Sequence, residues 1–332
     1  MKAVRVREFG PPGVLAAEEL PEPRPGEGQA VVDVSVAGVN FIETLTRSGA
    51  FAGGADPEPF VPGNEVGGVV SEVGSGADPT LVGRRVVTGT GGQGGYAERV
   101  AVGADGLLEV PQELGTETAV ALFAHGRTAL GLVREARPVR GERVLVEAAG
   151  GGVGSLLVQL ANRAGATVIA AAGSARKLEL ARSLGADASV SYRSPGWGEL
   201  VRREAGGDGV DVVFDSVGGE IGREAFDLLV GGGRFAVFGF ASGSPTQATI
   251  GEILRQGVTV VGFGGGRLLH RPGYARELEA EALREAAAGR LEPVIGQTFT
   301  LERAAEAHAA VESRETLGKT LLIPRTAGWG TL

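Results

Sequence analysis

The chain has 332 residues, including 57 glycines, three histidines and no cysteine, and its formal net charge is −8. The lack of cysteine excludes disulfides, iron–sulfur clusters, zinc ribbons and thiol nucleophiles, and three separated histidines offer almost no donor set for a transition metal. The acidic charge and the absence of a long apolar run argue against nucleic acid and membranes as partners, so we expect a cytoplasmic protein.

The first third of the chain is rich in short strands. Runs with alternating or β-branched residues at 2–9, 29–39, 65–74, 84–91 and 94–102 are separated by glycine and proline. This pattern predicts an irregular, β-rich unit that extends to about residue 110.

From about residue 123 the hydrophobic period changes. Apolar strand-like runs alternate with helical stretches that end at glycine, and the predicted strands are 143–147, 167–171, 188–191, 210–214, 234–238 and 258–262. This alternation predicts a doubly wound parallel sheet of about six strands, covered by helices on both faces. Helices over 273–289 and 301–313 and a strand at 319–324 are expected to follow.

A glycine-rich turn joins the first of these strands to a helix. Read against the dinucleotide motif G-x-G-x-x-G, Ala149 takes the first place, Gly151 the second and Gly154 the third. Gly151 would let the backbone approach a pyrophosphate, and Gly154 would let helix and strand pack closely. The start of that helix supplies N–H groups and a positive dipole end for phosphates.

The end of the second strand indicates which dinucleotide binds. A site that prefers NAD usually places an acidic residue there, but residues 170–178 contain none, and Glu179 lies inside the next helix. Ser174, Arg176 and Lys177 stand at this tip instead. A hydroxyl and two cations suit the additional 2′-phosphate of NADPH, which is the cofactor that we expect.

The order of these motifs resembles a known family. AAGGGVGSLLVQLA, ARKLELARSLGAD and VDVVFDSVGG follow AGVNFIETLTRSG, PGNEVGGVV and GGYAERV, as in the zinc-independent quinone oxidoreductase branch of the medium-chain dehydrogenase/reductase superfamily. The resemblance runs from MKAVRV to TLLIP. It implies an α/β protein with a GroES-like β-rich catalytic domain at 1–122 and 267–332 and an NADPH-binding Rossmann domain at 123–266. It also implies a homodimer formed through the last Rossmann strand, at about 258–263.

The resemblance also implies site residues. Asn40 would lie beside the nicotinamide and polarise the substrate, and Arg314 would reach the cofactor from the C-terminal part of the chain. The other implied cofactor residues are Gly151, Gly152, Val153 and Gly154 for the pyrophosphate, Gly173, Ser174, Lys177 and Tyr192 for the 2′-phosphate, Ser216 on the adenine side, and Phe238, Gly239, Phe263, Gly264 and Gly265 along the nicotinamide. Thr128 is a further polar candidate for cofactor binding.

Zinc-dependent members of the superfamily use a cysteine and the histidine of a PGHE motif, but here the motif reads Pro62-Gly63-Asn64-Glu65. No metal site is therefore expected. Without a Lewis acid, the favoured hydride acceptors are a quinone or an activated C=C bond. Thr46 and His125 join Asn40 as candidate catalytic residues.

Several other polar residues are expected to have structural and not catalytic roles. Arg47 and Glu65 are expected to be structural ionic groups, Tyr96 a packing residue, and His308 an ordinary helix residue. Leu45 and Phe51 stand where related enzymes often have tyrosine. This difference predicts a wider, more apolar pocket.

The sequence thus favours an NADPH-dependent reductase that transfers a hydride to a small-molecule quinone. One alternative is an enone or enoyl-thioester reductase, which acts on an activated alkene. The other is a non-catalytic protein that binds NADPH for a structural or regulatory purpose.

Overall fold

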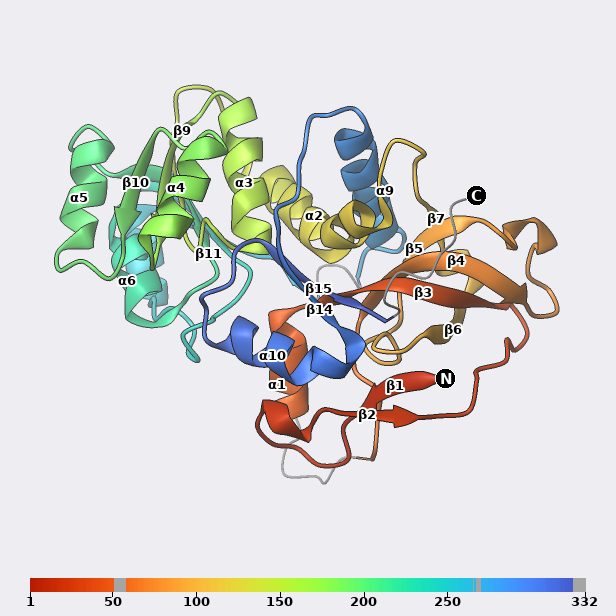
Figure 1. Cartoon of the computed structure of the whole chain (residues 1–332). Coiled ribbons are helices and arrows are strands. Elements are labelled where there is room, and N and C mark those ends of the chain that lie inside the picture. Colours follow the sequence, from red (N-terminus) through yellow and green to blue (C-terminus); the bar gives the residue numbers. More distant parts are fainter. Residues whose placement is uncertain (51–57, 265, 267–269, 325–332) are drawn as a thin grey trace. The chain divides into compact units, whose positions relative to one another are not determined.

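The computed structural model describes residues 1–50, 58–264, 266 and 270–324 (Figure 1). The chain separates into two compact units, one formed by Met1–Ala124 with Leu283–Leu332 and the other by His125–Ala282. The second unit is therefore an insertion in the first. We call the first the discontinuous unit and the second the inserted unit.

The inserted unit is built on a six-stranded parallel sheet with the order β10-β9-β8-β11-β12-β13. The chain first runs from β8 to β10 on one side and then from β11 to β13 on the other, so the direction reverses between β8 and β11. The strands are β8 (Arg143–Val146), β9 (Thr167–Ala172), β10 (Ala188–Ser191), β11 (Val210–Asp215), β12 (Leu229–Val237) and β13 (Thr259–Gly262). The predicted doubly wound sheet is confirmed.

Helices cover both faces of this sheet (Figure 1). One face packs on α5, α6 and α7 through side chains that include Trp197, Val201, Phe226 and Ile253. The opposite face carries α3 and α4, because their connections run the other way along the sheet. The helices are α2 (Thr116–Ala136), α3 (Gly152–Arg163), α4 (Ala175–Ser183), α5 (Trp197–Glu204), α6 (Gly219–Asp227), α7 (Ile250–Gln256) and α9 (Tyr274–Ala287).

Helix α5 has no counterpart among the predicted elements. It begins directly after Ser194-Pro195-Gly196, which is a turn sequence, and Gly196 adopts a left-handed φ of 66° at its N-cap. Tertiary packing stabilises this short helix, since Trp197 and Val201 are buried against the sheet.

The inserted unit ends later in the chain than residue 266, where the domain boundary was expected. Ion pairs hold α9 to α2: Arg134 pairs with Glu277 at 2.7 Å, and Arg127 pairs with Glu279 at 2.6 Å. Most of α9 therefore belongs to the inserted unit, although the sequence changes character before it.

The discontinuous unit contains a seven-stranded, mainly antiparallel sheet with the order β14-β15-β3-β4-β5-β7, in which β6 also pairs with β3. A separate pair, β1 and β2, lies outside it. The elements of this unit are β1 (Lys2–Arg5), β2 (Ala16–Glu19), β3 (Gln29–Val39), α1 (Phe41–Ser48), β4 (Glu65–Val73), β5 (Arg85–Gly89), β6 (Arg99–Gly103), β7 (Leu108–Glu109), β14 (Ile295–Thr300), α10 (Ala304–Glu312) and β15 (Lys319–Ile323). Because β15 pairs with β3, the C-terminal strand completes a sheet begun near the N-terminus.

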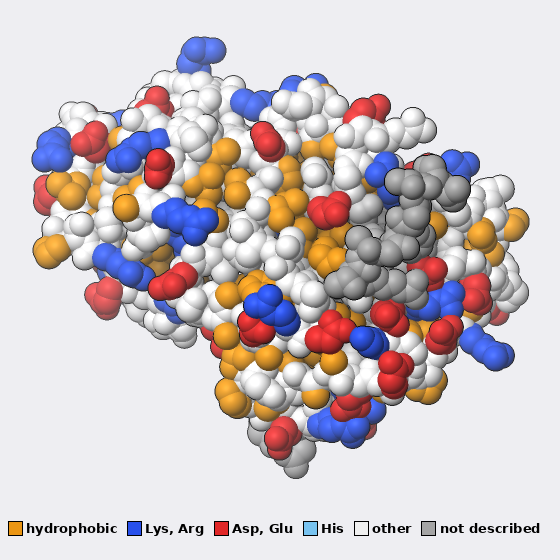
Figure 2. All heavy atoms as spheres, viewed as in Figure 1, with side chains coloured by type: hydrophobic (Ala, Val, Ile, Leu, Met, Phe, Trp, Pro, Cys, Tyr) orange, Lys and Arg blue, Asp and Glu red, His pale blue; other side chains and the backbone are white. Residues whose placement is uncertain are grey.

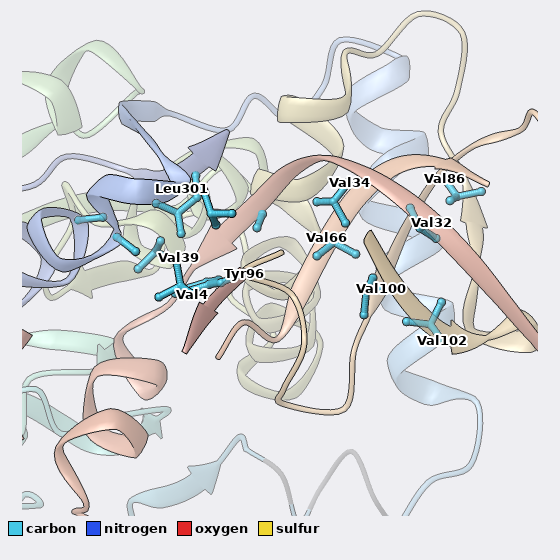
Figure 3. Close-up of a cluster of buried hydrophobic side chains, with 14 of the residues drawn as sticks. Val4, Val32, Val34, Val39, Val66, Val86, Tyr96, Val100, Val102 and Leu301 are labelled. Carbon is cyan, nitrogen blue, oxygen red and sulfur yellow. The ribbon is translucent and has the colours of Figure 1, made fainter. Parts of the chain in front are cut away.

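Alternation along the strands builds the core of this unit. Figure 3 shows Val32 and Val34 of β3, Val66 of β4 and Val100 of β6 gathered in one buried cluster. Residues two apart in a strand face the same side, so Val32 and Val34 both point inward. Each buried valine contributes about 1.5–3 kcal/mol to the stability of the fold.

Acidic and basic side chains are intermingled on the face of the molecule shown in Figure 2. No helix within the described part of the chain is both long enough and apolar enough to span a lipid bilayer.

Candidate functional site

The glycine turn after β8 is shaped by close backbone contacts. Gly151 lies at the N-cap of α3 and offers no side chain to cap it. A Cβ at Gly154 would lie 2.3 Å from the carbonyl oxygen of Ala148, so strand and helix can approach this closely only with glycine there. The first N–H groups of α3 have no intrahelical acceptor, which suits this helix end to a phosphate.

His125 of α2 packs directly on this turn. A Cβ at Gly152 would lie 2.0 Å from the His125 Nδ1 atom, so the half-buried imidazole rests on the backbone where α3 begins. The structure thus brings two predicted site residues together.

Basic and aromatic side chains gather where β9 and β10 end. A Cβ at Gly150 would lie 2.7 Å from the Cβ of Lys177. A Cβ at Gly173 would lie 3.1 Å from the Nε of Arg193 and 3.2 Å from the Cε2 of Tyr192. The glycines therefore allow these three side chains to close over the strand ends.

Arg193 is the residue of this cluster that sequence reasoning missed. It follows β10, and the carboxyl ends of neighbouring parallel strands meet at one sheet edge, so it lies beside the tip of β9. Its place directly after Tyr192 is a signal that could have identified it. Ser174 is exposed at the N-cap of α4 in the same region.

An open pocket of about 410 Å³ lies at the ends of β12 and β13. The ring of Phe263 is only 4 % exposed and rests on α2, because a Cβ at Gly131 would lie 2.1 Å from its Cζ. Ser216 adjoins the pocket, since a Cβ at the lining residue Gly239 would lie 3.3 Å from the Ser216 carbonyl oxygen. The pocket is lined by Val237, Phe238, Gly239, Phe240, Gly262, Phe263, Gly264 and Gly266, whereas the predicted Gly265 lies outside the described residues.

In the discontinuous unit, Asn40 belongs to a buried ionic network. Its Nδ2 donates to Glu65 Oε1 at 3.0 Å and to Glu43 Oε1 at 3.4 Å, and its Oδ1 accepts from Lys319 Nζ at 2.7 Å. Lys319 also forms an ion pair with Glu65, and both side chains are at most 1 % exposed. Asn40 thus has a structural part here, and its contact with a substrate stays a prediction.

The network continues through Glu43. Its carboxylate accepts the Asn40 N–H at 2.9 Å, the Asn64 N–H at 2.8 Å and the Tyr96 hydroxyl at 2.7 Å. Burial raises the pKa of Glu43, although the Asn40 N–H, Lys319 and Tyr96 act against this shift. Burial and then the Glu43 charge raise the pKa of Tyr96 well above its usual value, so Tyr96 stays protonated and donates.

His308 lies at the inner end of the network. Its Nε2 is 3.0 Å from the Tyr96 hydroxyl, and the two rings meet edge to face. Burial, followed by the charge of Arg47, lowers the pKa of His308 to about 3, so the imidazole is neutral. Tyr96 and His308 therefore form polar contacts inside the core, which the sequence interpretation did not anticipate.

The remaining candidates have varied surroundings. The Thr46 hydroxyl donates to the Ile42 carbonyl oxygen within α1 at 3.1 Å. Thr128 is half-buried in α2, and Arg314 is exposed in the discontinuous unit with a left-handed φ of 59°. The catalytic or cofactor roles of these three residues stay predictions.

Two expected structural residues are confirmed as such. Arg47 is buried and forms an ion pair with Glu312, and Glu65 is fully buried. Within the described ranges, no cluster of three or more His, Asp or Glu side chains has an arrangement that could hold a metal ion.

Both units match known families. Residues 26–112 match the family described as "Alcohol dehydrogenase GroES-like domain", and residues 152–285 match "Zinc-binding dehydrogenase". Quinone oxidoreductase 1 of Escherichia coli K12 is 34 % identical over 336 residues, which cover 97 % of this chain and 99 % of that protein. The chain belongs to the zinc-independent quinone oxidoreductase family of the medium-chain dehydrogenase/reductase superfamily.

Other relatives of this oxidoreductase agree with that assignment. The 2-haloacrylate reductase of a Burkholderia species is 33 % identical over 342 residues, with 97 % of this chain and 99 % of that protein covered. The crystal structure of E. coli quinone oxidoreductase complexed with NADPH has a TM-score of 0.88 and 31 % identity, over 98 % of this chain and 100 % of that chain.

Proposed function

We propose that this oxidoreductase is an NADPH-dependent reductase that transfers a hydride to a quinone. The observation that carries the proposal is the cationic, acid-free end of β9 beside the glycine turn, in a chain whose relatives include proteins named quinone oxidoreductases. Lys177 and Arg193 complement the negative charge of a 2′-phosphate, whereas an acidic residue there would repel it.

The inserted unit fits a dinucleotide. Side chains are missing where a pyrophosphate would approach the backbone, and a Cβ at Gly154 would collide with Ala148. The reduced nicotinamide, when bound, supplies the hydride. The chain's own residues orient it: Gly151–Gly154 would hold the pyrophosphate, Lys177 and Arg193 the 2′-phosphate, and the apolar wall at Phe238 the nicotinamide.

Reduction of an activated C=C bond is the second candidate function. A 2-haloacrylate contains such a bond, and a relative named for this substrate is 33 % identical to the chain. Leu45 supports this candidate, because it stands where related quinone reductases often have a tyrosine. Phe51, the other such position, lies outside the described residues.

Turnover measurements separate the two candidates. We expect the purified chain to oxidise NADPH in the presence of simple ortho- and para-quinones, followed by the loss of nicotinamide absorbance. No turnover with any quinone, together with a saturated product from crotonyl-CoA or an alkenal, would replace the quinone with the alkene. Tight NADPH binding without turnover of either class would leave the non-catalytic alternative.

Replacing Lys177 by alanine should weaken NADPH binding much more than NADH binding. One charge-assisted hydrogen bond contributes about 1.5–3 kcal/mol, so we expect the Kd for NADPH to rise roughly 10- to 100-fold. Fluorescence titration with both cofactors measures the difference.

The matched control is Arg182→Ala, which removes an exposed cation from the last turn of the same helix. It should change neither Kd. An equal loss of affinity for both cofactors in Lys177→Ala would contradict the 2′-phosphate role. Arg193→Ala tests the residue that the sequence did not reveal, and we expect the same preference for loss of NADPH binding.

We also propose that two copies associate through β13. This strand lies at the edge of the sheet, and Val260 on it is 45 % exposed. An exposed edge strand with apolar side chains is a template for pairing with another strand. Light scattering of the purified chain gives its mass in solution, and a monomer would contradict the proposal. The cytoplasmic location stays a prediction.

A further inference from the structure

Two buried acidic residues lie side by side at the centre of the parallel sheet. Glu147 is the first residue after β8, and Asp215 is the last residue of β11. Both are fully buried, and the Glu147 N–H donates to the Phe214 carbonyl oxygen at 3.1 Å. The chain direction reverses between these two strands, and open parallel sheets bind ligands at such a point.

Asp215 accepts three hydrogen bonds, which leaves its carboxylate able to accept another. Its Oδ1 accepts the backbone N–H groups of Val217 at 2.9 Å and Gly218 at 2.8 Å, and its Oδ2 accepts the Thr246 hydroxyl at 2.5 Å. The contact between Asp215 and Thr246 requires glycine at position 222, where a Cβ would lie 2.0 Å from the Thr246 Oγ1. Both carboxyl oxygens of Asp215 are therefore engaged by donors of the protein itself.

Asp215 thereby ties together two loops next to the candidate cofactor site. Val217 and Gly218 belong to the loop after β11, and Thr246 belongs to the loop after β12. Backbone bonds join the same loops, since the Ser242 N–H donates to the Val217 carbonyl oxygen at 2.7 Å. The second loop begins at Phe238, in the wall of the 410 Å³ pocket.

Glu147 has the opposite environment. Neither of its carboxyl oxygens accepts a hydrogen bond from any donor in the described part of the chain. Burial, and then the neighbouring charge of Asp215, raises the pKa of Glu147 well above its usual value, against a smaller opposing effect of the Val217 N–H. A buried carboxyl group that accepts no hydrogen bond and faces a carboxylate gains a hydrogen-bond partner when it is protonated. Its O–H group can then donate to the carboxylate.

We propose that Glu147 is protonated at neutral pH and donates a hydrogen bond to Asp215, and that this acid pair is a positioning element for the cofactor site. The inference rests on the proposed binding of NADPH. If Glu147 loses its proton, two like charges face each other under the glycine turn, and the loops held by Asp215 are pushed out of place. A negative charge there also opposes the cofactor's phosphates. NADPH binding should therefore weaken at alkaline pH.

Other ionisable groups near this turn are His125 from α2, which lies on Gly152, and Lys177 from α4, which lies on Gly150. Asp215 is the charged group that faces Glu147 from β11. Because His125 adjoins the same turn, the test needs variants that separate His125 from Glu147.

Infrared spectroscopy of the protein without cofactor tests directly for the proton. Infrared spectroscopy at neutral pH should show the C=O band of a protonated carboxylic acid, which shifts in D₂O and disappears in Glu147→Gln. The control is Glu113→Gln, an exposed position in the discontinuous unit, which should keep the band. A spectrum of the unaltered chain without this band would overturn the proposal, whatever the variants do.

The Kd for NADPH, measured from neutral to alkaline pH, tests the coupling. For the unaltered chain we expect it to rise up to about tenfold per pH unit once Glu147 ionises. Glu147→Gln supplies a neutral donor to Asp215, so its Kd should match at neutral pH and lose the alkaline rise, whereas His125→Gln should keep the rise. An identical pH dependence in Glu147→Gln and the unaltered chain would contradict the coupling.

Stability provides a second measurement that needs no cofactor. Because the folded chain binds the Glu147 proton more tightly than the unfolded chain does, its contribution to stability is complete below the unfolded pKa and is lost as pH rises through the folded pKa. The unfolding free energy of Glu147→Gln should therefore increase relative to that of the unaltered chain as pH rises. If NADPH fails to bind at every pH, the proposed cofactor is wrong, while the infrared band and the stability profile still decide whether Glu147 holds a proton.

Discussion

Gly154→Ala should weaken NADPH binding by about 10- to 100-fold, because displacing the turn would lose about one charge-assisted hydrogen bond to the phosphates, or about 1.5–3 kcal/mol. The added Cβ would lie 2.3 Å from the Ala148 carbonyl oxygen and 2.9 Å from the Ala149 Cα. These are backbone atoms that cannot rotate away, so α3 must move off β8. We expect the unfolding free energy to fall by about 1–3 kcal/mol as well, measured by denaturant titration.

Gly13→Ala is the matched control for this substitution. Gly13 has no heavy atom within 4 Å of the position of an added Cβ, and its backbone is not left-handed. Both the unfolding free energy and the Kd for NADPH should be nearly unchanged. Normal NADPH binding in a folded Gly154→Ala protein would show that the turn does not hold the pyrophosphate.

Lys319→Met should lower the unfolding free energy by about 3–5 kcal/mol, because it leaves the Glu65 carboxylate buried without its cation. Lys319 and Glu65 are 1 % and 0 % exposed, so water cannot replace the lost partner. The Oδ1 of Asn40 also loses its donor. Denaturant titration at neutral pH measures the change.

A second substitution distinguishes the unpaired charge from simple loss of packing. Adding Glu65→Gln to Lys319→Met removes the negative charge and should restore part of the lost stability. Lys2→Met is the surface control: Lys2 pairs with Glu302 at 2.9 Å, but both side chains are well exposed. It should leave the unfolding free energy nearly unchanged. A double variant no more stable than Lys319→Met would argue against an electrostatic origin.

Much of the inserted unit is readable from local sequence. Buried parallel strands are continuous apolar runs, and helices that end at glycine follow them, so the six strands and the turn at Gly151–Gly154 appear directly in the pattern. Helix α5 does not appear, because its first residues form a turn sequence and its stability comes from the burial of Trp197 and Val201.

The residues of the candidate site likewise divide into those that local sequence reveals and those that only tertiary packing reveals. Gly173, Lys177 and Tyr192 could be assigned through the order of motifs, because each belongs to a local pattern with a recognisable position. Arg193 could not, since its relevance depends on the pairing of β10 with β9. The part played by His308 depends on its contact with Tyr96, 212 positions away in the chain.

By itself, the sequence determined the order of strands and helices, the glycine turn and the lack of cysteine, because each is a property of neighbouring residues or of composition. Only the tertiary structure placed Lys319 against Glu65, which lies 254 positions earlier, and Glu147 against Asp215. Sequence patterns record which residues are apolar and how they repeat. They do not record which buried charges meet, because that depends on the pairing of distant strands. This pairing places Glu147 beside a second acid, with which it can share a proton, and Glu65 beside a cation.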